Sequence, residues 1–175
     1  SAFERTVLAE GKLSEKLKNL PQNTSEVFRD SYLLDFLNLP DDHSEKDLQQ
    51  AIVTSLKEFI LELGGSYAFL GQEFRLQVGN EDFYIDLLFY NRDLNCLIAF
   101  ELKVDNFKPS FLGQLEFYLE ALDTDVRKEH ENPSIGILLC RTKDDEVVKY
   151  ALNRSLSPAV VSDYETKLIP KEILR

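Results

Sequence analysis

The stretch that decides the fold spans residues 83–104. It reads FYIDLLFY at 83–90 and CLIAFELKV at 96–104, joined by the turn NRDLN. Both apolar runs have the length of strands, and the first is apolar on both faces, which is typical of a central strand covered on both sides. Asp86 interrupts the first run, and Glu101 and Lys103 share one face of the second. Because an unpaired buried carboxylate is costly, these three groups need a common reason.

A divalent cation would supply that reason. Mg²⁺ takes one or two carboxylates together with a carbonyl oxygen and several waters, a donor set that Asp86, Glu101 and the Leu102 carbonyl would provide. Lys103 would then lie beside the cation, where it would orient an attacking water and offset charge on a phosphate. The alternative interpretation is a structural ion pair across the two strands.

The register of the two strands decides whether these side chains meet. Directly opposed residues of an antiparallel pair share a face, and a shift by one residue turns a side chain to the other face. Pairing of Asn91 with Cys96 would bring Asp86 opposite Glu101, whereas a register shifted by one residue would separate them. We predict the Asn91–Cys96 pairing or a bulge with the same effect.

The rest of the chain predicts helices around a mixed sheet. Hydrophobic spacing, the possible capping pair Ser44 and Asp47, and Pro and Gly breaks set the elements. We expect helices over residues 26–39, 44–63, 109–122 and 142–153, and strands over 67–78, 83–90, 96–104, 135–140 and 159–161. This order indicates an α/β fold with helices on both sides of the sheet.

Composition and charge exclude several classes of protein. The chain has 175 residues and a formal charge of −11, and no apolar run approaches the ~20 residues that cross a bilayer. Cys96 and Cys140 lie in apolar runs, which is typical of buried thiols in a reducing cytoplasm, and they match no zinc-ligand spacing. The acidic charge counts against nucleic-acid binding, although lysines near a metal act within a Debye length of ~10 Å.

Two strand motifs and one helix motif resemble the PD-(D/E)XK nuclease superfamily. The strand motifs are Ile-Asp at 85–86 and Glu-Leu-Lys at 101–103, and the sequence has Ile where the superfamily name has Pro. Gln114 and Tyr118 match the Gln-x-x-x-Tyr motif of the RecB-like branch and lie on one helix face. The strings at 83–90 and 132–140 are similar to the C-terminal nuclease domain of the YhcG-like bacterial family.

This resemblance implies a restriction-endonuclease-like fold with the core order αβββαβ. It also implies hydrolysis of phosphodiester bonds in DNA with Mg²⁺ or Mn²⁺, in which Asp86, Glu101 and the Leu102 carbonyl hold the metal and Lys103 positions the water. Gln114 and Tyr118 would orient the site or contact the substrate, and are otherwise a surface amide and a half-buried tyrosine.

Many relatives also hold the metal with a glutamate on the first helix. The first helical turn here reads Asp-Leu-Gln-Gln at 47–50, which leaves Glu45 or Glu58 as substitutes. Three cations near the predicted site, Lys108, Arg141 and Lys143, are either contacts to DNA phosphates or solvated side chains, and we favour solvated side chains.

We expect two regions in the chain. Residues 1–40 would form an N-terminal arm and short helix that link to an N-terminal domain absent from this sequence, and residues 41–175 would form the nuclease-like domain. The sequence contains no Met, as expected for a fragment of a longer protein. A homodimer would be the simplest way to cut both DNA strands.

Two other functions compete with the DNA nuclease. One is a non-catalytic, degenerate nuclease fold used for protein assembly or DNA binding, which the acidic net charge and the incomplete first-helix motif favour. The other is a metal-dependent hydrolase of a different phosphate ester.

Overall fold

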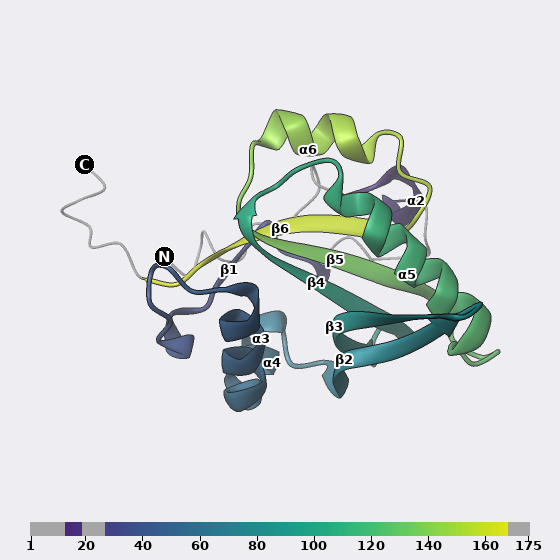
Figure 1. Cartoon of the computed structure of the whole chain (residues 1–175), viewed down its shortest axis with the longest axis horizontal. Helices are drawn as coiled ribbons and strands as arrows, with labels where there is room; N and C mark the ends of the chain where they lie inside the picture. The colour runs from purple at the N-terminus through teal and green to yellow at the C-terminus, as the bar shows by residue number, and fades with distance from the viewer. Residues whose placement is uncertain (1–12, 19–26, 168–175) are drawn as a thin grey trace.

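A six-stranded mixed sheet organises the molecule, with the strand order β1-β6-β5-β4-β3-β2 (Figure 1). The computed structural model describes residues 13–18 and 27–167. The strands are β1 (Ser31–Leu33), β2 (Tyr67–Val78), β3 (Glu81–Asn91), β4 (Cys96–Asn106), β5 (Asn132–Thr142) and β6 (Ala159–Glu165). The helices are α2 (Glu15–Lys18), the 3-10 helix η3 (Asp35–Leu37), α3 (Glu45–Thr54), α4 (Leu56–Leu63), α5 (Phe111–Asp125) and α6 (Asp145–Leu152). β2, β3 and β4 form an antiparallel meander, and β4, β5, β6 and β1 run parallel. The predicted α/β fold, with its core order αβββαβ, is confirmed.

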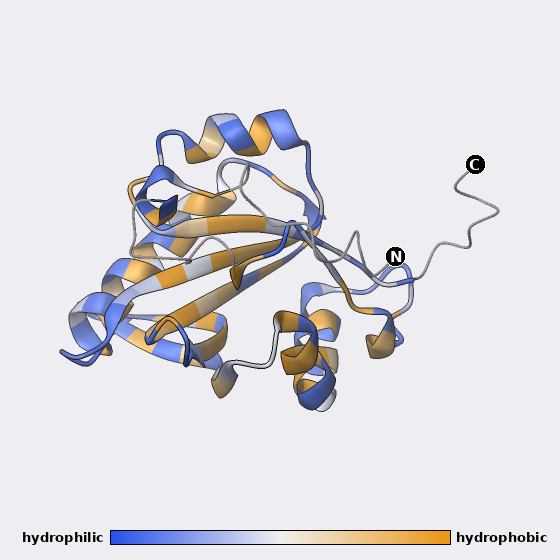
Figure 2. Cartoon of the chain, turned by 180° about the vertical axis from the view of Figure 1, so that it is seen from behind, coloured by the Kyte–Doolittle hydropathy of each residue, from blue (hydrophilic) through white to orange (hydrophobic). Residues whose placement is uncertain are grey.

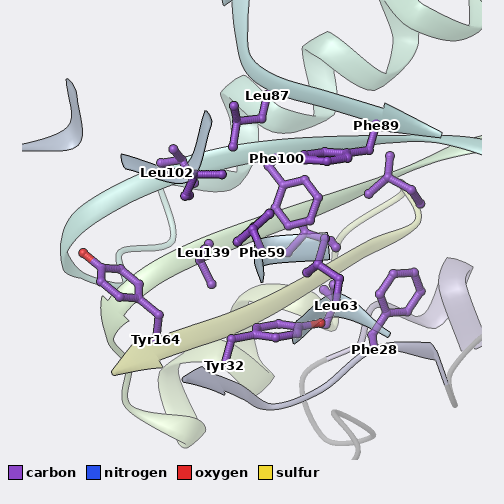
Figure 3. Close-up of a cluster of buried hydrophobic side chains, with 14 of the residues drawn as sticks. Phe28, Tyr32, Phe59, Leu63, Leu87, Phe89, Phe100, Leu102, Leu139 and Tyr164 are labelled. Carbon is purple, nitrogen blue, oxygen red and sulfur yellow. The ribbon is translucent and has the colours of Figure 1, made fainter. Parts of the chain in front are cut away.

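The sheet is covered on both faces, as the doubly apolar strands predict. α3 and α4 pack on one face, and α5 and α6 pack on the other (Figures 1 and 2). On the first face, Phe59, Phe89 and Phe100 meet with ring centroids 5.3–5.9 Å apart (Figure 3). On the second face, Gly136 lets α5 lie close to β5, because a Cβ there would be 2.8 Å from the Leu115 side chain.

The β3–β4 register follows the predicted pairing. Asn91 pairs with Cys96, and the ladder runs from there to Leu87 and Phe100, where it ends. Beyond that point β3 continues alongside β2, and β4 continues alongside β5 to Asn106. The sheet therefore forks between β3 and β4, one residue before the predicted site.

The predicted helix over residues 26–39 is wrong. The described part of this segment, residues 27–39, contains β1 and η3 instead. β1 pairs in parallel with β6, and Tyr32 is buried in the core. Pairing with β6, some 130 residues away, overrides the local helical pattern and makes β1 the edge strand of the sheet. η3 then ends at Asn38, which adopts a left-handed conformation with φ 53°.

The other predicted helices form, but one of them is divided in two and another begins later than predicted. The Ser44 capping box is present: Ser44 Oγ accepts from the Asp47 amide, and the Asp47 carboxylate accepts from the Ser44 amide. The helix predicted over 44–63 is broken at Ser55 into α3 and α4. α6 begins after Asp144 rather than Thr142, because Thr142 still belongs to β5.

None of the helices within residues 13–18 and 27–167 has both the length and the apolar character required to span a bilayer. Cys96 and Cys140 are both buried and free, as their apolar surroundings predict.

Candidate active site

Asp86 lies at the fork between β3 and β4. The ladder ends at Leu87–Phe100, and a continuation of its register by one step would set Asp86 opposite Glu101. Asp86 Oδ2 accepts a hydrogen bond of 2.8 Å from the Leu102 backbone N–H, which ties its side chain to β4 where the ladder has ended. The two strands thus bring Asp86, Glu101 and Leu102 together, as the parity argument requires.

The Glu101 carboxylate is buried at the fork. Its side chain is only 4% exposed, and its Oε1 has no hydrogen-bond partner among the described residues. Burial, followed by the nearby charge of Asp86, raises the pKa of Glu101 to about 8. Burial also raises the pKa of Asp86, while the Leu102 N–H and the charge of Lys103 act in the opposite direction. The pair is therefore short of positive charge.

Lys103 lies beside these carboxylates on the face of the sheet that α5 covers. Its Nζ is 4.8 Å from the centroid of the Phe111 ring, a distance at which a cation interacts favourably with an aromatic face. The charge of Lys103 lowers the pKa of both Asp86 and Glu101. Phe111, the first residue of α5, thereby helps to hold the ammonium group near the fork.

Gln114 and Tyr118 extend the site along α5. Gln114 Nε2 donates a hydrogen bond of 2.9 Å to the Tyr118 hydroxyl. Tyr118 is buried, and Gln114 is exposed at the rim. Burial and then the charge of Glu101 raise the pKa of Tyr118, so the phenol is within electrostatic range of that carboxylate.

Of the two first-helix candidates, Glu45 is the one that lies at the fork. Glu45 Oε2 is 3.5 Å from the Val104 backbone nitrogen, and its charge contributes to the raised pKa values of Asp86 and Glu101. Glu58 lies exposed one helix further, on α4. The Ser44 capping box was the sequence signal for Glu45, because it places this residue in the first turn of α3.

Sequence reasoning missed Glu73 on β2. Its neighbours Gln72 and Phe74 pair with Leu87 and Ile85, so Glu73 lies across from Asp86. The charge of Glu73 also contributes to the raised pKa of Asp86. The alternation along 67–78 predicts only an ordinary outward side chain at this position, so the pattern carries no signal for it.

Two of the three basic candidates are engaged inside the domain. Lys143 is neither a DNA contact nor a solvated lysine: its side chain is 2% exposed and pairs with Asp30 and Asp163. The guanidinium of Arg141 donates to the Asp41 carbonyl. Lys108 is exposed, with its Nζ 6.0 Å from the Phe111 ring centroid.

Comparison with known proteins gives one family. The model of the "YhcG PDDEXK nuclease domain" matches residues 25–174. "Putative nuclease YhcG" of Escherichia coli (strain K12) is 36% identical over 170 residues, which cover 95% of this chain and 45% of that protein. The chain thus spans less than half the length of this curated relative.

Two solved structures are similar to part of this chain. A repair endonuclease from Pyrococcus abyssi has a TM-score of 0.45 and 17% identity, covering 74% of this chain and 50% of its own. The EndoMS–dsDNA2 complex has a TM-score of 0.42 and 17% identity, covering 67% and 46%. With the family model matched over residues 25–174, the chain belongs to the YhcG PDDEXK nuclease domain family.

Proposed function

We propose that this chain is a metal-dependent nuclease domain that hydrolyses phosphodiester bonds in DNA. The observation that carries the proposal is the buried Glu101 carboxylate, which lies against Asp86 and has one oxygen without a hydrogen-bond partner in the described part of the chain. A buried anion in this state is unfavourable unless a cation compensates it. Family membership supports the same chemistry.

The donor set at the fork fits Mg²⁺ or Mn²⁺. Residues 13–18 and 27–167 contain no group of three or more His, Cys, Asp or Glu side chains placed to hold a metal ion, so the proposed site uses only two side chains. Two carboxylates, from Asp86 and Glu101, with the Leu102 carbonyl leave the remaining positions to water, which is the arrangement that Mg²⁺ prefers. A softer metal such as Zn²⁺ is disfavoured, because the proposed donors are oxygens and include no Cys or His side chain.

The residues around the fork would then have distinct roles. A bound divalent cation would supply a water of lowered pKa and stabilise charge on the phosphate. The Leu102 N–H holds Asp86 in place, and Lys103 would orient the attacking water and neutralise charge in the transition state. Tyr118, oriented by Gln114, would contact the substrate or fix the rim of the site.

DNA affinity would depend on more than this domain. The chain carries a formal charge of −11, and Lys143 and Arg141 are used internally. We therefore propose that an N-terminal domain of the longer protein, or a second copy of the chain, provides the basic surface that duplex DNA requires. The same charge favours the second candidate, a non-catalytic module of this fold that serves in assembly.

Calorimetric titration with Mn²⁺ tests the proposal. The wild-type chain should bind the cation, Asp86→Asn should not, and Asp82→Asn, an exposed aspartate on the same strand, should bind like the wild type. Cleavage of plasmid DNA by the full-length protein, with and without Asp86→Asn, then tests catalysis. Absence of binding in the wild type would mean that the carboxylates are structural and would favour the non-catalytic module.

A further inference from the structure

Both ladders of β3 are interrupted at Asp86. The β3–β4 ladder ends at Leu87, and the β2–β3 ladder passes from Gln72–Leu87 to Phe74–Ile85, leaving Glu73 and Asp86 facing one another between these pairs. Glu73 has a backbone φ of 45°, in the left-handed region that Gly and Asn adopt more easily than Glu. A carboxylate thus occupies a backbone position that disfavours it, directly beside the candidate site.

The ion pair of Glu73 does not explain this placement. Lys46 Nζ lies 3.1 Å from Glu73 Oε1, and the two side chains are 63% and 48% exposed. Ion pairs this exposed contribute little to stability, and a left-handed glutamate costs stability. Backbone strain of this kind is concentrated at functional sites, where the surrounding structure maintains it.

The ion pair instead connects two sides of the fork. Lys46 follows Glu45 on α3, and Glu73 lies on β2 across from Asp86, so the pair spans from the first helix to the outer strand of the meander. When all four carboxylates near the fork, Asp86, Glu101, Glu45 and Glu73, are ionised, as a bound cation would favour, they exceed the lysines Lys46 and Lys103 by two charges. Two positive charges are what one divalent cation supplies.

We propose that Glu73 is a further acidic residue of this cation site, acting through bound water, and that Lys46 is its counterion when no cation is bound. The inference rests on the proposed function, because it requires a divalent cation at Asp86 and Glu101. We propose that water mediates this contact, because the Glu73 side chain is 48% exposed and its Oε1 is 3.1 Å from Lys46 Nζ. Mg²⁺ keeps several of its waters in proteins, and these would reach Glu73.

The proposal predicts opposite changes in cation affinity for variants of Glu73 and of Lys46. Removing the Glu73 charge should weaken cation binding, and removing the Lys46 charge should strengthen it. Each change should be about three- to tenfold, as expected for a unit charge that acts on a divalent cation through water. A purely structural ion pair would instead give the same direction for both variants, or no change.

Calorimetric titration of the full chain with Mn²⁺ at fixed ionic strength tests this. The variants are Glu73→Gly, which removes the carboxylate and suits the left-handed backbone, Glu73→Gln, and Lys46→Gln. Glu81→Gln, an exposed glutamate on the same hairpin, is the matched control and should bind like the wild type. Thermal melts of each variant show that the fold is kept.

Weaker binding in both Glu73 variants with tighter binding in Lys46→Gln supports the inference. Unchanged affinity in either Glu73 variant, or weaker binding in Lys46→Gln, would overturn it. If Asp86→Asn abolishes binding while the Glu73 variants do not affect it, the proposed function stands and only this inference fails. If the wild type does not bind Mn²⁺, both fail.

Discussion

Two clusters in this domain each place one lysine near two carboxylates, Lys143 near Asp30 and Asp163 and Lys103 near Asp86 and Glu101, and they differ in how directly the lysine contacts the carboxylates. Lys143 Nζ donates hydrogen bonds of 2.9 Å to Asp163 Oδ2 and 3.1 Å to the Asp30 carbonyl, and it forms an ion pair of 3.2 Å with Asp30 Oδ1. At the fork, Lys103 lies over the Phe111 ring, and Glu101 keeps an oxygen without a hydrogen-bond partner in the described residues.

This difference suggests that the Lys143 cluster is structural and that the cluster at the fork is the candidate site. In the Lys143 cluster, next to β1, β5 and β6 at one side of the sheet, the ammonium group contacts both carboxylates directly. The fork opens where β3 and β4 part, so the backbone there does not close over the carboxylates. The same residue types therefore form direct ion pairs in one place, and in the other they form the site that we propose for a cation.

The largest expected effect is on the Lys143 cluster. Lys143→Met should lower the free energy of unfolding by about 3 kcal/mol, the low end for breaking a buried ion pair, because the two aspartates are each about a quarter exposed. Urea denaturation at pH 7 measures the change. Lys18→Met, in an exposed pair, is the control and should shift the value by less than about 1 kcal/mol. Equal effects in the two variants would contradict a structural role for Lys143.

A second prediction concerns the pH dependence of the cluster at the fork. The pKa of Glu101 is about 8 in the folded chain and near 4.5 when unfolded, so the folded state binds more protons between these values. Stability is therefore lost as the pH rises from about 4.5 to 8 and stays low above that. Glu101→Gln, which is neutral at every pH, should be more stable than the wild type by roughly 2 kcal/mol at pH 9 and equal to it near pH 5.

Denaturant melts of the metal-free chain across this pH range measure the effect. Glu120→Gln, an exposed glutamate on α5, is the matched control and should track the wild type throughout. A constant difference between Glu101→Gln and the wild type at pH 5 and pH 9 would contradict the raised pKa.

A smaller effect on stability is expected at Lys103. Lys103→Met should change the free energy of unfolding by about 1 kcal/mol or less, since Asp86 and Glu101 can take up protons when the cation is lost. DNA cleavage by the full-length protein should nevertheless fall by roughly 10²-fold or more, because the proposed transition-state charge is left uncompensated. A Lys103 variant that cleaves normally would remove the role proposed for this residue.

The sequence predicted the centre of the site better than its surroundings. Asp86 and Glu101 could be placed together because strand parity is a strict local rule, and the Asn91–Cys96 register obeys it. Glu73 could not be foreseen, since nothing in the local pattern of residues 67–78 signals its left-handed backbone. The burial of Lys143 could not be foreseen either, because its partners Asp30 and Asp163 lie 113 and 20 residues away in the sequence.

The same distinction explains the missed strand. Residues 31–33 form β1 because β6 offers a parallel edge, a partner that no local pattern in the first 40 residues contains. Long-range pairing decides such segments, whereas helices such as α3 are decided by their own caps and apolar stripe.

The smallest expected effect tests how far the cluster at the fork extends along α5. Tyr118→Phe removes the hydroxyl that accepts from Gln114 and leaves the buried ring in place, so the free energy of unfolding should fall by only about 0.5–1 kcal/mol. If the phenol belongs to the site, cleavage should fall several-fold in Tyr118→Phe and in Gln114→Ala alike, since one orients the other. Phe117 is a neighbouring exposed aromatic, and Phe117→Leu should leave cleavage unchanged. If Tyr118→Phe and Gln114→Ala lower stability but leave cleavage unchanged, Gln114 and Tyr118 are not part of the site and form only a hydrogen-bonded pair on α5.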